Sequence, residues 1–240
     1  MIELIPAIDI IEGKCVRLTH GDFALKTVYA EDPVEVASRF KSVGLRRLHI
    51  VDLDGAKRGS PANIPTLERI ASTTSLMIDF GGGIKTDADV AAVLNAGAAI
   101  VNVGSVAVKN PETFLGWIER FGGDRILLGA DCKDEKIAVN GWQEQTDISV
   151  CTLLSNYFSR GVRSAFVTDI GRDGAMTGPS LDLYKMIIAD LPELELIASG
   201  GVRSIEDLEA LELVGCTGVI VGKAIYEGRI SDEELSRYAC

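Results

Sequence analysis

Two aspartates at matching places in the two halves of the chain could form an acid/base pair. Asp9 follows the apolar run of residues 4–8, and Asp131 follows the run of residues 126–130, so each carboxylate is expected at the end of a buried strand. Burial and neighbouring charges can tune the proton affinity of a carboxyl group in such a setting. One group can then donate a proton while the other accepts one. The alternative is that each aspartate caps a loop or pairs with a lysine.

Glycine-rich segments that could bind phosphate recur in the same order in both halves. Asp54-Gly55-Ala56 recurs as Asp173-Gly174-Ala175, and Gly82-Gly83 recurs as Gly200-Gly201. Offsets of 119 and 118 residues (173 − 54 and 200 − 82) indicate two fused half-proteins. Glycines that follow a strand and precede a helix let the backbone turn tightly and present its amides to an anion. Tight turns without a ligand are the alternative.

The repeated segments predict two phosphate sites facing one cavity. The first site would contain Gly82, Gly83, Gly104 and Ser105, and the second would contain Gly178, Gly200, Gly201, Gly222 and Lys223. Lys85 is expected to assist the first site, because its cation lies where the next helix begins. Two such sites suit a small-molecule bisphosphate with a phosphate at each end.

Further polar and aromatic side chains could contact this ligand. Thr168 ends the sixth predicted strand and can donate a hydrogen bond, whereas Asp173 either contacts the substrate or caps a turn. His49 and Asp52 belong to the second strand and are candidates of the same kind. Trp142 follows the fifth strand and could stack on a flat heterocycle, or it could pin its loop to the barrel rim. Because the chain has only two histidines, a three-histidine zinc centre is excluded.

Composition excludes several classes of protein. A formal net charge of −11 argues against nucleic acid as a partner, because such binding depends on a concentrated positive field. No segment approaches the roughly 18 unbroken apolar residues of a membrane span, and the amino terminus lacks the pattern of a signal peptide. Five scattered cysteines fit a reducing compartment. We therefore expect a cytoplasmic protein that binds neither nucleic acid nor membrane.

Eight apolar strands alternate with eight helices, which predicts how these side chains are positioned. The strands are expected at residues 2–9, 47–53, 76–80, 100–103, 126–131, 164–168, 195–199 and 218–221. The helices are expected at residues 34–43, 64–71, 87–95, 111–120, 149–159, 181–191, 205–214 and 232–237. Irregular segments are expected at residues 11–32, 54–63, 132–147 and 169–180.

This order of elements predicts an α/β fold, a single-domain (β/α)8 TIM barrel over residues 1–240. A doubly wound open sheet is the alternative. The internal repeat favours the barrel, because two half-barrels, roughly residues 1–122 and 123–240, remove their sheet edges by closing on each other. The long loops after the strands would then form the catalytic face.

The motifs resemble those of the histidine-biosynthesis isomerases over essentially the whole chain. Members of this family convert the aminoaldose ProFAR, an N-formimino aminoimidazole-carboxamide ribotide, to its ketose PRFAR in the fourth step of histidine biosynthesis. The resemblance rests on Pro6-Ala7-Ile8-Asp9-Ile10, Val16-Arg17-Leu18, Gly21-Asp22-Phe23, the segment Leu48 to Ala56, Gly81-Gly82-Gly83-Ile84, Gly141-Trp142, Asp173-Gly174 and Ala198-Ser199-Gly200-Gly201-Val202.

The resemblance implies an Amadori rearrangement, an aldose–ketose isomerisation, without a metal or an organic cofactor. Asp131 would protonate the ring oxygen of the aminoribose, and Asp9 would remove the C2 proton of the resulting iminium. Thr168 and Asp173 would support ring opening, Trp142 would stack on the ligand, and the first loop would close over it. Lys85, Cys132 and Ser105 stand where the family more often has arginine, a small aliphatic residue and threonine; none of these changes removes a catalytic group.

Three other functions compete with this interpretation. One is a dual-substrate isomerase that also accepts phosphoribosylanthranilate in tryptophan biosynthesis. Another is the sister cyclase, the cyclase subunit of imidazole glycerol phosphate synthase, but its expected Cys-Leu-Asp start is Ala7-Ile8-Asp9 here. The last is a non-catalytic phosphosugar-binding barrel, which could dispense with Asp9 and Asp131. We expect the chain to act as a monomer.

Overall fold

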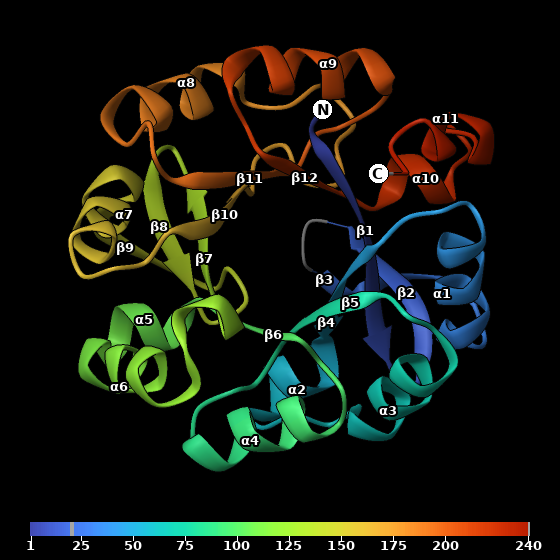
Figure 1. Ribbon diagram of the computed structural model, residues 1–240, viewed down its shortest axis with the longest axis horizontal. Coiled ribbons are helices and arrows are strands. Elements are labelled where there is room, and N and C mark those ends of the chain that lie inside the picture. Colours follow the sequence, from blue (N-terminus) through green and yellow to red (C-terminus); the bar gives the residue numbers. More distant parts are fainter. Residues whose placement is uncertain (20–21, 240) are drawn as a thin grey trace.

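The computed structural model, which describes residues 1–19 and 22–239, contains one closed barrel of eight parallel strands (Figure 1). The strands in barrel order are β1 (Glu3–Ile11), β4 (Arg47–Asp52), β5 (Met77–Gly81), β6 (Ile100–Val103), β7 (Ile126–Lys133), β10 (Ser164–Asp169), β11 (Glu195–Ser199) and β12 (Gly218–Val221). Parallel pairing of β12 with β1, from Glu3 opposite Gly218 to Pro6 opposite Val221, closes the ring. The fold is therefore the predicted (β/α)8 barrel and not an open sheet. Gly21, which begins the Gly21-Asp22-Phe23 motif, lies outside the described residues.

The predicted helices are all present and surround the barrel (Figure 1). They are α1 (Pro33–Ser42), α3 (Ile64–Thr73), α4 (Asp87–Asn95), α6 (Pro111–Phe121), α7 (Val150–Phe158), α8 (Leu181–Asp190), α9 (Ile205–Val214) and α11 (Asp232–Ser236). Pro33, Pro65 and Pro111 lie in first turns, where the missing amide donor leaves no hydrogen bond unmade. None of the helices in the described part of the chain is both long and apolar enough to cross a membrane.

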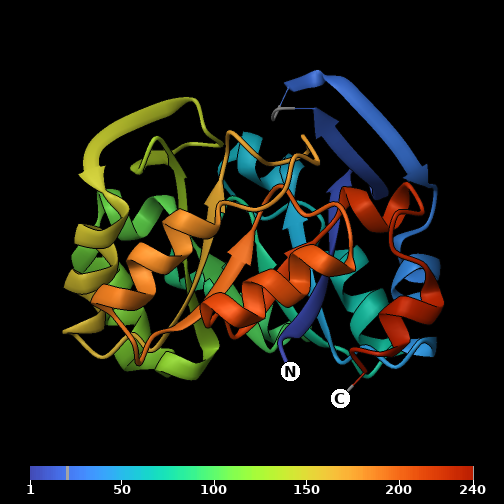
Figure 2. The same cartoon turned by 90° about the horizontal axis from the view of Figure 1, so that it is seen from above.

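Two β-hairpins replace segments that the sequence predicted to be irregular. They are β2 (Lys14–Thr19) with β3 (Asp22–Ala30), and β8 (Lys136–Val139) with β9 (Glu144–Ser149). A two-residue turn at positive φ connects each hairpin to the preceding barrel strand, with which its first strand pairs antiparallel. The turn residues are Glu12 and Gly13, at 53° and 73°, and Asp134 and Glu135, at 50° and 63°. Such turns match the twist of the flanking strands and favour tight hairpins. Figure 2 shows both hairpins at the end of the barrel opposite the two termini.

Three short helices also follow strands at this end. Helix α2 (Leu53–Arg58) lies within the segment expected to be irregular, and α5 (Ser105–Lys109) and α10 (Lys223–Tyr226) begin directly after Gly104 and Gly222. A 3-10 turn at Gly123–Arg125 precedes β7. The positions of α5 and α10 agree with the internal repeat, because each follows the fourth strand of its half.

The apolar core has two layers, one inside the barrel and one between strands and helices. The inner cluster is small and consists of Ile5, Ala7, Leu127, Ile197 and Ile220. The outer layer contains most of the buried apolar residues of the described chain, including the fully buried side chains of the helices. Close packing of the outer layer holds each strand in place, so that its carboxyl end and the side chains there have fixed positions.

Tyr184 is the clearest single link between the helical layer and the barrel strands. Its side chain on α8 is fully buried. The hydroxyl donates to the carbonyl of Ser199 at 2.8 Å and accepts from the amide of Ser199 at 3.2 Å. Ser199 ends β11, directly before the Gly200-Gly201 turn. The Tyr184 hydroxyl therefore makes the hydrogen bonds of two backbone groups at the residue where β11 ends and the next loop begins.

We predict that Tyr184→Phe lowers the free energy of unfolding by about 1–3 kcal/mol, because two buried backbone groups lose their partner. Urea unfolding followed by circular dichroism would measure the change. Tyr29→Phe is the matched control, because the Tyr29 hydroxyl makes an exposed contact of 3.4 Å with Glu227. A Tyr184→Phe protein as stable as the Tyr29→Phe protein would contradict this role.

Candidate active site

A cavity of about 980 Å³ opens at the carboxyl ends of the barrel strands, large enough for a bisphosphate of the expected size. Most of the residues predicted from the sequence line it. These are Asp9, His49, Gly82, Gly83, Lys85, Gly104, Ser105, Asp131, Trp142, Thr168, Asp173, Gly200, Gly201, Gly222 and Lys223. Topology explains this convergence, because the carboxyl ends of all eight parallel strands meet at one mouth.

Two predicted residues, Asp52 and Gly178, are not among the residues that line the cavity. The Asp52 carboxylate is fully buried and accepts hydrogen bonds from the amides of Gly55, Ala62 and Asn63 at 2.6–2.9 Å. It also accepts from the Asn63 side chain at 2.7 Å. With its acceptor sites engaged, Asp52 holds the loop around α2 in place. We propose this positioning role for Asp52 instead of contact with substrate.

Gly178 contacts the backbone of the second glycine turn, Gly200-Gly201. Its amide donates to the carbonyl of Gly201 at 3.0 Å. Gly201 has φ of 83°, and a Cβ there would lie 2.4 Å from the Gly178 carbonyl oxygen. Gly83 matches it in the first half, with φ of 77° and a Cβ position 2.2 Å from the Gly55 carbonyl oxygen. Only glycine fits either turn, and the two turns have similar φ at this position.

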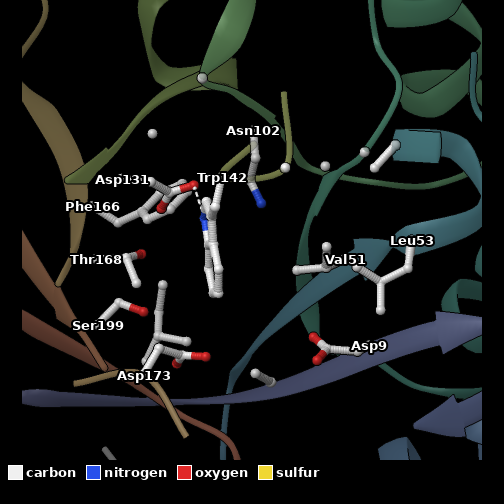
Figure 3. A pocket seen from close by; sticks show the side chains of 18 of the residues that line it. Asp9, Val51, Leu53, Asn102, Asp131, Trp142, Phe166, Thr168, Asp173 and Ser199 are labelled. Atoms are coloured by element: carbon white, nitrogen blue, oxygen red, sulfur yellow. Dashed lines mark hydrogen bonds between the residues drawn. The ribbon is translucent and has the colours of Figure 1, made fainter. Parts of the chain in front are cut away.

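The candidate acids lie on opposite sides of the cavity (Figure 3). Asp9 comes from β1 and Asp131 from β7, which are the first strands of the two halves. Burial raises the pKa of both carboxyl groups. The Trp142 side chain donates its Nε1–H to Asp131 at 2.9 Å and projects into the cavity (Figure 3). Thr168 is paired in register with Asp131, and hydrogen bonds from Trp142 and Thr168 partly oppose the effect of burial.

Asp9 has a different environment, because a buried arginine lies beside it. Arg17 on β2 donates from Nη1 to Asp9 at 3.2 Å and from Nη2 to both oxygens of Asp173 at 2.8 and 3.1 Å. Burial raises the pKa of Asp9, the charge of Arg17 opposes that shift, and the charge of Asp173 adds to it. The guanidinium thus connects the hairpin of the first half to the loop after β10 in the second half.

Arg17 was missed as a site residue in the sequence analysis. A single cation in the otherwise apolar run Cys15 to Leu18 was the available signal. Asp79 and Asn102, which are both buried, were missed as well, and Asn102 lines the cavity. Both lie within continuous strand patterns, where an inward polar side chain cannot be distinguished from an outward one by sequence alone.

Lys223, which is predicted to assist the second phosphate site, already has partners. Lys223 at the start of α10 donates to the Gly174 carbonyl at 2.9 Å and pairs with Glu227 at 3.8 Å. Lys85 lies beside Gly59, the residue that ends α2. Among the described residues, no group of three or more His, Cys, Asp or Glu side chains is arranged to hold a metal ion.

Fold and site together define a (β/α)8 barrel with two buried carboxylates facing one cavity at the carboxyl ends of its strands. Comparison with known families agrees: the model of the family described as histidine biosynthesis protein matches residues 3–231. The chain belongs to this family.

Full-length curated relatives share about half of the sequence. A protein of Parabacteroides distasonis is 55% identical over 99% of this chain and its own full length. Proteins of Azobacteroides pseudotrichonymphae and Flavobacterium johnsoniae are 52% and 49% identical, over 100% and 99% of both chains. All three are named 1-(5-phosphoribosyl)-5-((5-phosphoribosylamino)methylideneamino) imidazole-4-carboxamide isomerase.

We predict that Arg17→Met raises the pKa of Asp9 further, because the opposing positive charge is lost while burial and Asp173 remain. Carbon-13 NMR of the labelled carboxyl group would follow its titration, with Asp9→Asn used to assign the signal. Arg39→Met is the matched control, because Arg39 pairs with Asp232 at the surface. An unchanged or lower pKa of Asp9 in Arg17→Met would contradict the proposed coupling.

Proposed function

We propose that this chain catalyses the Amadori rearrangement of ProFAR to PRFAR, the fourth step of histidine biosynthesis. The observation that carries this proposal is the pair of buried carboxylates facing each other across one cavity, which two glycine turns at positive φ also line. The near full-length relatives, whose printed name describes this compound with its two phosphoribosyl groups, support the same reaction. The activity is that of an intramolecular aldose–ketose isomerase.

The reaction needs one proton delivered to oxygen and one removed from carbon. We assign delivery to Asp131, which protonates the ring oxygen of the aminoribose so that the ring C1–O bond breaks and an iminium forms. Asp9 then removes the C2 proton, and the electron pair of that C–H bond neutralises the iminium to give an enolamine. Tautomerisation of the enolamine gives the ketose. Ring opening breaks the C1–O bond, whose electron pair stays on the ring oxygen, and the remaining changes are proton transfers within one molecule. No external oxidant or reductant is therefore involved.

The surroundings of the two carboxyl groups support this division of roles. Asp9 has the Arg17 guanidinium 3.2 Å away, which favours the ionised form that a base requires. Asp131 instead receives hydrogen bonds from the neutral groups of Trp142 and Thr168. Its strongest influence is burial, which favours the protonated form that an acid requires. Burial is the largest influence on the pKa of both carboxyl groups, and the cation beside Asp9 is the feature that distinguishes their surroundings.

The remaining lining residues bind and orient the substrate in this proposal. One phosphate would be held by the amides around Gly82, Gly83, Gly104 and Ser105, assisted by Lys85. The other would be held by the amides around Gly200, Gly201 and Gly222, assisted by Lys223. Thr168 and Asp173 would support ring opening, and the indole of Trp142 would stack on the imidazole while its Nε1–H holds Asp131.

We propose further that the enzyme acts in the cytoplasm as a monomer. The carboxyl ends of all eight strands of one closed barrel contribute residues to the cavity, which supports a site formed within a single chain. The substrate is a small anion that backbone amides can bind at contact range despite the net charge of −11.

A turnover assay tests the proposal. We predict that the purified protein converts ProFAR to PRFAR without added metal, cofactor or second protein, as measured by absorbance and by chromatography of the product. Asp9→Asn should lower kcat by about 10²–10⁴-fold, because general base catalysis is lost, while PRFAR still binds within a few fold in calorimetric titration. Asp182→Asn, at a fully exposed position on α8, is the control.

Lack of turnover by the wild-type protein would contradict the proposal, as would full activity of Asp9→Asn. Phosphoribosylanthranilate, assayed with the same preparations, distinguishes a single-substrate enzyme from the dual-substrate alternative. Ammonia added with PRFAR tests the cyclase alternative in the same way, and product formation there would overturn the isomerase assignment.

A further inference from the structure

A row of polar side chains crosses the barrel interior below the candidate acids. Arg47 and His49 on β4, Asp79 on β5 and Asn102 on β6 are all buried, next to the small apolar cluster that fills the rest of the interior. Arg47 also reaches Glu3, which lies at the amino-terminal end of the barrel, at 3.4 Å. Burying such groups normally lowers stability unless they are well paired. Their presence here therefore suggests a role beyond filling the barrel.

Asp79 is the centre of this row, and three side chains contact its carboxylate. Arg47 Nε donates to Oδ2 at 2.9 Å, and Asn102 Nδ2 donates to Oδ1 at 2.7 Å. His49 Nδ1 lies 2.5 Å from Oδ1. Burial raises the pKa of Asp79, but His49, Arg47 and Asn102 outweigh it, so that the pKa lies below its usual value. Asp79 is therefore a carboxylate, which can accept hydrogen bonds but cannot donate one.

The position of the His49 proton follows from this arrangement. Because Asp79 only accepts, the short contact with His49 requires a hydrogen on Nδ1. Asn102 Nδ2 also lies 3.2 Å from His49 Nδ1, but it donates to Asp79 Oδ1 at 2.7 Å. The carboxylate oxygen is the closer neighbour of Nδ1, at 2.5 Å, and two acceptors cannot meet at that distance without a hydrogen between them. The neutral imidazole is thus fixed as the Nδ1–H tautomer.

The opposite edge of the His49 ring is the one available to a ligand. His49 lines the cavity, yet its Nδ1 points to Asp79 in the barrel wall, so the Nε2 edge is left for the cavity. Phe166 packs against the ring edge to face, with centroids 5.3 Å apart, and restricts its rotation. In the neutral form Nε2 carries a lone pair and accepts a hydrogen bond.

We propose that Asp79 is a positioning residue, which fixes the tautomer of His49 so that Nε2 accepts a hydrogen bond from a hydroxyl group of the sugar substrate. This inference rests on the proposed function for the identity of the ligand, but the tautomer itself does not depend on it. Arg47 and Asn102 hold Asp79 in place. His49 touches the ligand, and Asp79 acts through it.

NMR of the two histidine side chains tests the proposal without substrate. The chain contains only His20 and His49, so a nitrogen-15 labelled sample gives two ring systems, which His20→Gln assigns. In the alkaline range, where imidazoles are neutral, two-bond proton–nitrogen spectra should show His49 with hydrogen on Nδ1 and a free lone pair on Nε2. In Asp79→Asn the side-chain amide can donate to Nδ1, and the population of the Nε2–H tautomer should rise.

Asp207→Asn is the matched control, since Asp207 is also buried but pairs with Arg203 on the outer side of the barrel. Its His49 signals should equal those of the wild type. An Nε2–H tautomer in the wild-type protein would overturn the proposal, even if Asp79→Asn does not fold. Unchanged His49 signals in a folded Asp79→Asn would overturn it as well.

Kinetics then test the link to catalysis. With ProFAR, Asp79→Asn should lower kcat/KM about ten-fold, as expected for a misdirected hydrogen bond, with the NMR change in the same sample. A tautomer change with no effect on kcat/KM would overturn the contact between His49 and the substrate. Absence of wild-type turnover would instead count against the proposed function and leave the NMR result to decide the role of Asp79.

Discussion

Closure of eight parallel strands into one ring is the constraint on which the other features depend. Each half of the chain provides four strands, and β12 pairs with β1 while β6 pairs with β7, so neither half leaves an open edge. Closure brings the first strand of one half opposite the first strand of the other. It thereby places Asp9 and Asp131 across a single cavity, although 122 residues (131 − 9) separate them in the sequence.

The repeat extends beyond the glycine turns to the elements at the cavity mouth. In each half a hairpin follows the first strand and a short helix follows the fourth. The halves then differ in detail: Trp142 of the second hairpin bonds to Asp131, whereas Arg17 of the first hairpin reaches Asp9 and Asp173. We propose that the halves divide near Gly122, where α6 ends. Two half-barrels of the same fold that carry different hairpin side chains would let Asp9 act as the base and Asp131 as the acid.

The sequence predicted the eight strands and eight helices well because their signals are local. Continuous apolar runs such as residues 126–130, and prolines such as Pro33 and Pro111 in first turns, depend only on neighbouring residues. The hairpins were not predicted, since their strands lie at the rim and carry polar residues. Asp134 and Glu135 also form a turn without glycine.

The individual site contacts were harder to predict, because they join segments that are distant in sequence. The Arg17–Asp173 pair spans 156 residues, and the contact of Asn102 with His49 spans 53. Asp52 and Asp54 were hard to assign for a different reason. Asp52 was a candidate for ligand contact and Asp54 belongs to the repeated Asp-Gly-Ala segment. However, the Asp52 carboxylate accepts hydrogen bonds from loop amides, and the Asp54 carboxylate accepts them from the Glu12 amide and the Asn63 side chain. Residue type alone cannot separate these uses of a carboxylate.

We propose that one ligand is held between the halves, with a phosphate at each end and an acid on each side. A crystal structure of Asp9→Asn soaked with ProFAR would show whether it is. We predict one phosphate at the Gly83 and Gly104 amides, the other at the Gly201 and Gly222 amides, and the aminoribose between residues 9 and 131. Both phosphates bound within one half, or a sugar out of reach of these two positions, would contradict the account.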